Sequence, residues 1–129
     1  MQMRLYTHLR AADLVKRIDQ AGIHAGAMLR LVAMKPSEAL KTHRAKLREI
    51  VARNGALRPR VFGSAIHGDD TEESDLDLLV DPTSSTTLMT LAAIQLEAER
   101  LLGVRVDVLT PKSLPPRYRD RVLLEAQPL

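Results

Sequence analysis

The sequence predicts an α/β protein, a small mixed β-sheet packed by helices, with an N-terminal helical extension. Three observations indicate this fold class. Segments with helical apolar periodicity alternate with short β-branched segments, Gly and Pro residues separate them, and 45% apolar content in 129 residues suffices for one core. The predicted order is helix, helix, strand, strand, helix, strand, helix.

The N-terminal part is predicted to be helical. Residues 9–33 place apolar side chains at spacings near three, four and seven, although Gly22 and Gly26 weaken this pattern. Residues 35–55, KPSEALKTHRAKLREIVARNG, predict a firmer helix with Ser37 as its N-cap and Gly55 as its stop signal.

Three strands and two helices follow. After a break at Pro59, RVFG (60–63) predicts a strand that runs into a turn, and SDLDLLV (74–80) predicts a second strand. The Ser/Thr cluster in DPTSSTT offers an N-cap for a helix over residues 88–102 that ends at Gly103. VRVDVLT (104–110) is the third predicted strand, and a proline opens the last helix, PPRYRDRVLLEA.

The composition excludes several classes of function. The absence of Cys removes disulfides, thiolate catalysis and Cys-based zinc sites, and one Phe, two Tyr and no Trp argue against nucleic-acid binding by base stacking. No apolar run approaches the length of a membrane span, and the N-terminus lacks the apolar segment of a secretory signal. We therefore expect a cytoplasmic protein that does not bind membranes.

Charge is unevenly distributed along the chain. Residues 1–60 carry 13 Lys and Arg against 4 Asp and Glu, whereas residues 61–100 carry 1 against 9. This segregation predicts an acidic centre that binds cations. The basic flank fits an anionic partner, nucleic acid included, or an ordinary solvated surface.

The acidic centre contains a pair of aspartates in a predicted strand. Side chains two residues apart in a strand point to the same side, so Asp75 and Asp77 share one face while Leu76, Leu78 and Val80 face a core. Neighbouring carboxylates repel each other unless a cation binds them, and oxygen-only ligands favour Mg²⁺ or Mn²⁺ over zinc. For the D-x-D pair alone, an exposed strand face is the favoured interpretation, because so short a motif often matches by accident. We interpret the preceding acids at 69–73 as a solvated turn.

Three other motifs fail on spacing. Gly63 and Gly68 match the opening of a phosphate-binding loop, but Asp69 and Asp70 stand where Lys and Ser or Thr are required. The segment FGSAIHG lacks the G-x-S-x-G spacing of a hydrolase nucleophile. Counted from Asp69, an EF-hand loop would need Gly and Glu where Ser74 and Val80 stand.

The remaining pattern is Gly63-Ser64, ten residues, Asp75-x-Asp77, and then Asp107 in a later strand. It resembles the minimal nucleotidyltransferases of the polymerase-beta-like superfamily, whose signature is G-S-x10-D-x-D followed by a third acid. The resemblance extends from about Met34 to the C-terminus. We therefore expect a minimal nucleotidyltransferase domain over residues 34–129 and a helical extension over 1–33, with Met34 as an alternative start.

The resemblance implies a role for each matching residue. Asp75, Asp77 and Asp107 would be catalytic and would hold Mg²⁺ or Mn²⁺, with Asp107 also the candidate base. Gly63, Ser64 and His67 would bind the nucleotide, ATP. Many relatives carry Arg at the position of His67, so phosphate binding here would depend on the charge or tautomer of the imidazole.

The resemblance also implies a biological role. Short bacterial members act as antitoxins that transfer AMP from ATP to a tyrosine of a partner HEPN-type toxin. Two alternatives stay open: an antitoxin that masks its partner without catalysis, and a nucleotidyltransferase that acts on a small molecule.

Overall fold

The computed structural model describes residues 34–129, so the predicted helix and extension over residues 1–33 lie outside the described residues. The described elements are α4 (Pro36–Arg53), β1 (Ala56–Phe62), α5 (Ser64–His67), β2 (Leu76–Pro82), α6 (Leu88–Leu102), β3 (Val106–Leu109), the 3₁₀ helix η1 (Pro111–Ser113), α7 (Pro116–Glu125) and β4 (Gln127–Pro128). Within residues 34–129, no helix combines the length and apolar character that crossing a membrane requires.

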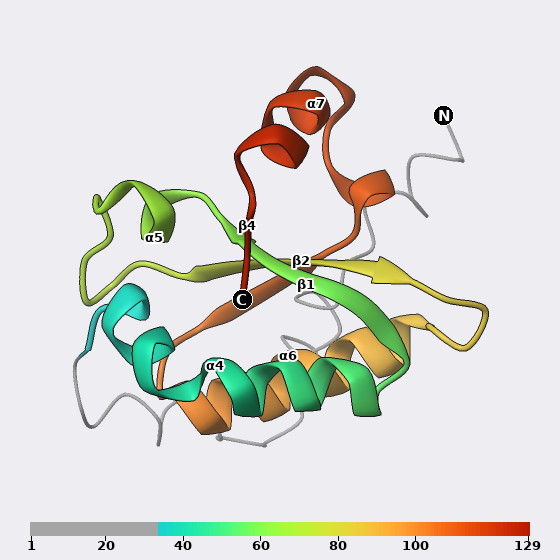
Figure 1. The fold of residues 1–129 in the computed structure, drawn as a ribbon, viewed down its shortest axis with the longest axis horizontal. Coiled ribbons are helices and arrows are strands. Elements are labelled where there is room, and N and C mark those ends of the chain that lie inside the picture. The colour runs from blue at the N-terminus through green and yellow to red at the C-terminus, as the bar shows by residue number, and fades with distance from the viewer. Residues whose placement is uncertain (1–33) are drawn as a thin grey trace, which may run out of the picture.

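The four strands form one mixed sheet in the order β3-β2-β1-β4. Strands β2 and β3 are parallel, whereas β1 is antiparallel to both β2 and β4. Helices α4 and α6 lie together against one face of the sheet, and α7 lies on the opposite side (Figure 1). The predicted fold class, a small mixed sheet packed by helices, is confirmed.

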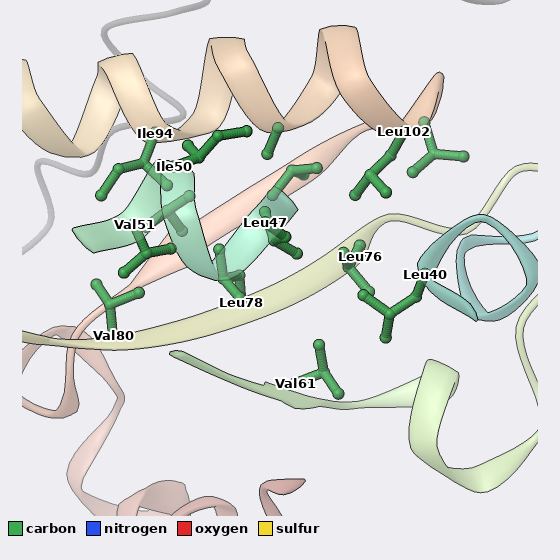
Figure 2. Packing of buried hydrophobic residues seen from close by; sticks show 14 of the residues in the cluster. Leu40, Leu47, Ile50, Val51, Val61, Leu76, Leu78, Val80, Ile94 and Leu102 are labelled. Atoms are coloured by element: carbon green, nitrogen blue, oxygen red, sulfur yellow. The ribbon is translucent and has the colours of Figure 1, made fainter. Parts of the chain in front are cut away.

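The main core lies between the sheet and the helices α4 and α6. Leu76, Leu78 and Val80 of β2 are fully buried there, as the alternation of the strand predicts. Figure 2 shows them among side chains of α4 and α6, including Leu47 and Ile94. Burial of large aliphatic side chains is the principal stabilising contribution to such a core.

A smaller apolar cluster covers part of the other face. It consists of buried leucines from β2, β3 and the segment after η1, with three half-buried side chains packed against them. Its members are Leu79, Leu109, Leu114, Phe62, Val122 and Ala126. The C-terminal segment therefore packs on the face of the sheet that α4 and α6 leave open.

Strand β1 is longer than the sequence predicts, because it continues on both sides of Pro59. Proline has no N–H to donate, so within a sheet it is found at edges and irregularities. Here the pairing register with β2 shifts between Leu57 and Arg60, and Arg58 has a positive φ of 48°, so Pro59 lies in such an irregularity. Arg58 and Arg60 both bind the carboxylate of Asp81 on β2. Burial raises the pKa of Asp81, but the hydrogen bonds and charges of the two guanidinium groups outweigh this and hold the pKa below its ordinary value.

The helix ends agree with the sequence at α6 and differ at α4. Thr87 caps α6 by exchanging hydrogen bonds with Thr90, and Gly103 ends it in the left-handed conformation, as predicted. Ser37 was expected to cap α4, and this prediction is wrong: the N-cap residue is Lys35, and Ser37 lies inside the first helical turn. The element α5, the helix η1 and strand β4 were not predicted, since they are too short to show periodicity.

Helix α6 offers a test of this packing with two residues of the same helix. Ile94 is fully buried against the sheet, whereas Leu96 is half-buried beside Ala92. We expect Ile94→Ala to reduce the free energy of unfolding by about 2–5 kcal/mol, and Leu96→Ala to cost clearly less. Chemical denaturation of both variants measures the difference. Equal losses would contradict a larger packing contribution from Ile94 than from Leu96.

Candidate active site

The candidate site lies at the end of the sheet where β1 finishes and where β2 and β3 begin. Phe62, the last residue of β1, pairs with Asp77 of β2, and Asp77 pairs with Asp107 of β3. Directly paired residues of neighbouring strands project to the same face of a sheet. The carboxylates of Asp77 and Asp107 therefore project side by side, next to the turn that follows Phe62.

The apolar neighbours of each aspartate determine its direction. Leu76 and Leu78 flank Asp77 and are buried in the main core, and Val106 and Val108 flank Asp107 in the same way. Because side chains alternate along a strand, both aspartates must leave the core on the opposite face. Both are half-buried there. The hydrophobic pattern thus sets two acids next to each other despite their mutual repulsion.

Gly63 brings the backbone against one of these carboxylates. Its φ of 79° and ψ of −151° belong to a region that only glycine adopts readily. A Cβ atom at this position would lie 2.4 Å from Oδ2 of Asp77, well inside van der Waals contact. The turn therefore requires glycine for two reasons, and Ser64, the first residue of α5, follows it directly.

Asp75 lies one residue before β2, and its side chain is exposed. No three acidic or histidine side chains of residues 34–129 converge as a complete metal site. The structure thus brings together Gly63, Asp77 and Asp107 and leaves Asp75 at the exposed margin. The oxygen donors of Asp77 and Asp107 still fit Mg²⁺ or Mn²⁺, because Mg²⁺ in proteins is commonly held by one or two carboxylates together with substrate phosphates and water.

His67 is the last residue of α5 and contacts the C-terminal helix. Its Nε2 atom lies 3.5 Å from Oε2 of Glu125, at the end of α7. The two side chains are 51% and 42% exposed, so the pair contributes little stability. Sequence reasoning did not predict this contact, which connects the segment after the Gly63-Ser64 turn with the C-terminal helix.

Asp70 departs most clearly from the sequence-based interpretation. The acids at 69–73 were expected to form a solvated turn, and three of them, Asp69, Glu72 and Glu73, are exposed. Asp70 instead is only 4% exposed, and its carboxylate accepts hydrogen bonds from the N–H and the hydroxyl group of Ser37. The interpretation is therefore wrong for Asp70. No local signal could reveal it, because its partner is 33 positions away.

Glu99 is a second buried acid that sequence reasoning missed. Its Oε2 accepts the backbone N–H of Val106 at 3.0 Å, directly before Asp107. Glu99 thereby ties the end of α6 to the start of β3. The available signal was the position of Glu99 on the same helix face as Ala92, Ala98 and Leu102 in the predicted helix over 88–102.

Comparisons with known proteins agree on one family. The sequence model of the nucleotidyltransferase domain family matches residues 44–129. A Methanocaldococcus jannaschii protein provisionally named protein adenylyltransferase is 38% identical over 81 residues, which cover 63% of this chain and 87% of the relative. The protein adenylyltransferase MntA of Thermococcus cleftensis is 37% identical over 86 residues, or 67% of this chain and 84% of the relative.

A solved structure agrees with these relatives. It is provisionally described as a minimal nucleotidyltransferase and superposes with a TM-score of 0.66 at 47% sequence identity. The match covers 72% of this chain and 95% of that structure.

Alanine substitutions at two glycines distinguish the effect of backbone strain from the effect of a contact with Asp77. Gly63 and Gly68 both have positive φ, but a Cβ at Gly68 would meet no atom within 4 Å. We expect Gly68→Ala to cost about 1–2 kcal/mol of stability through backbone strain alone. Gly63→Ala should also displace the Asp77 carboxylate, and should therefore weaken Mg²⁺-ATP binding far more than Gly68→Ala does.

Thermal unfolding and calorimetric titration with Mg²⁺-ATP measure the two effects. Equal weakening of nucleotide binding in both variants would contradict a specific role for the approach of Gly63 to Asp77.

Proposed function

Because this chain belongs to the minimal nucleotidyltransferase family and is a nucleotidyltransferase, we propose that it transfers AMP from ATP to a hydroxyl group of a partner protein. The observation that carries the proposal is the pairing of Asp77 with Asp107 beside the Gly63-Ser64 turn. The similarity to proteins named protein adenylyltransferase supports ATP as the donor and a protein as the acceptor.

The aspartates would hold the divalent cation that such chemistry uses. Asp77 and Asp107 supply adjacent oxygen donors, and Asp75 adds a third from the exposed margin of the site. We propose Mg²⁺ or Mn²⁺ as the cation, since the candidate ligands contain neither sulfur nor nitrogen. When bound, the cation offsets the charge of the triphosphate and orients its phosphates.

The other site residues would bind the triphosphate. The hydroxyl group of Ser64 and the backbone N–H groups of the turn can donate hydrogen bonds to phosphate oxygens. The close backbone of Gly63 lets the phosphates approach the carboxylates. His67 can donate from its imidazole when that group is not bound to Glu125.

The transfer itself needs a base and a leaving group. The acceptor oxygen attacks the α-phosphorus of ATP, the bond from that phosphorus to the bridging oxygen of the β-phosphate breaks, and pyrophosphate leaves with the bonding electrons. Asp107 would accept the proton of the attacking hydroxyl group. Its position beside Asp77 supports this role, because the acceptor must reach the same end of the sheet.

The acceptor would be a tyrosine of a HEPN-type toxin, with the chain acting as its antitoxin. This finer assignment rests on the resemblance of the Gly63-Ser64 and Asp75-x-Asp77 motif to short family members with that role. The similarity to proteins named protein adenylyltransferase favours a protein over a small molecule as the acceptor.

Mass spectrometry of the partner tests the proposal directly. After incubation with ATP and Mg²⁺, the wild-type chain should add AMP to a tyrosine of the proposed HEPN-type partner. Asp77→Asn should add none, because the substitution keeps the shape but removes an anionic ligand. Omission of the metal should have the same effect. A partner that is neutralised but not modified by the wild type would replace the enzymatic proposal with masking.

Asp107→Asn tests the assignment of the base. We expect the transfer rate at saturating ATP to fall about 10²- to 10⁴-fold, since general bases contribute on this scale. The affinity for Mg²⁺-ATP should fall much less. Single-turnover rates and titration calorimetry measure the two quantities. An affinity loss as large as the rate loss would assign Asp107 to cation binding alone.

A further inference from the structure

The ten residues between Ser64 and Asp75 separate the two halves of the candidate site. We propose that Asp70, in the middle of this spacer, is a positioning residue for the nucleotidyl-transfer site. The inference rests on the proposed function, because it concerns the same site. Asp70 acts through the backbone of the spacer and does not itself touch the nucleotide.

Asp70 joins the spacer to the start of α4. Its Oδ2 atom accepts the backbone N–H of Ser37 at 2.8 Å, and its Oδ1 atom accepts the Ser37 hydroxyl at 3.0 Å. Ser37 is the second residue of α4, whose own N-cap residue, Lys35, makes no capping hydrogen bond with its side chain. Asp70 therefore supplies from the spacer the acceptor that the first turn of α4 lacks.

The physical chemistry makes this a strong anchor. A carboxylate is stabilised near the N-terminus of a helix by the exposed N–H groups and the helix dipole, and hydrogen bonds to a charged acceptor are stronger than neutral ones. Asp70 is only 4% exposed, so its carboxylate would be left without compensation if it lost Ser37. It is also the only buried residue among residues 65–74.

The rest of the spacer is fixed at short intervals on both sides of Asp70. The N–H of Asp69 donates to the carbonyl oxygen of Ser64 at 3.1 Å. Thr71 and Ser74 close a turn by donating an N–H to each other's oxygen atoms. The N–H of Leu76 then donates to the carbonyl oxygen of Arg105 at 2.8 Å.

These bonds make Asp70 the link between the spacer and the helical layer. Within residues 34–129, the hydrogen bonds of the turn at 71–74 lie inside the turn itself, so loss of Asp70 would let the turn move as a unit relative to α4. Asp75 follows this turn directly, and α5 precedes Asp70 by two residues. Loss of the hydrogen bonds between Asp70 and Ser37 would therefore displace Asp75 and the turn at Gly63-Ser64. Asp77 and Asp107 would stay in place, because they belong to the sheet.

Four variants of the full chain test the inference. Asp70→Ala removes both hydrogen bonds, and Ser37→Ala removes only the one from the hydroxyl. Asp70→Asn can still accept the Ser37 N–H and can donate its amide to the Ser37 hydroxyl oxygen. Asp69→Asn is the matched control, because it makes the same chemical change at the exposed neighbouring acid.

The readouts are the affinity for Mn²⁺-ATP, measured by electron paramagnetic resonance of Mn²⁺, and the kinetics of transfer, at a temperature well below the Tm of each variant. We expect Asp70→Ala to weaken Mn²⁺-ATP binding and to lower kcat/KM by about tenfold or more. Asp70→Asn should recover most of this loss, Ser37→Ala should show a smaller loss, and Asp69→Asn should match the wild type.

A purely structural role predicts a different result. If Asp70→Ala lowers Tm but keeps wild-type Mn²⁺-ATP affinity and kinetics, the inference is overturned. If Asp70→Ala does not fold, Ser37→Ala decides, and wild-type binding in that variant overturns the inference. If the wild type binds Mn²⁺-ATP but modifies no protein, the proposed function fails. The Mn²⁺-ATP affinity of Asp70→Ala relative to the wild type still tests the positioning role of Asp70.

Discussion

The arrangement of this domain depends on the two-sided character of strand β2. Its leucines and valine at alternate positions are fully buried against α4 and α6. That burial, which stabilises the fold, forces Asp77 onto the opposite face, where Asp107 joins it from the parallel neighbour β3. A shift of β2 by one residue would bury its aspartates and expose its leucines, so the hydrophobic core fixes the register of the acidic pair.

The repulsion between the carboxylates of Asp77 and Asp107 acts at one end of the sheet, where the surrounding structure leaves room for a cation. Gly63 approaches Asp77 with backbone alone, and the carboxylates remain accessible enough for a cation and phosphates. At the far end of the same face, Arg58 and Arg60 neutralise Asp81. The acids of β2 thus meet two environments: Asp81 lies beside two guanidinium groups, which favours stability, and Asp77 lies beside a second carboxylate, that of Asp107, which suits cation binding and the proposed transfer of AMP.

Hydrogen bonds to buried carboxylates connect the layers around this site. Glu99 ties the end of α6 to the start of β3, and Asp70 ties the spacer to the start of α4. Each carboxylate satisfies a backbone N–H that regular secondary structure leaves without a partner. The two helices that form the core therefore also hold the two segments that flank the carboxylate pair.

The sequence by itself determined the elements with strong local signals. Apolar periodicity defined α4 and α6, Thr87 and Gly103 defined the ends of α6, and the alternation in β2 predicted which residues face the core. The motif spacing led to the family, which the comparisons show. The roles of the six candidate site residues stay predictions. Only the tertiary structure decided which acids come together. Asp77 and Asp107 meet through strand pairing, and Asp70 is buried against Ser37, whereas Asp75 stays exposed. The sequence could not reveal the two contacts, because each joins residues that are far apart along the chain.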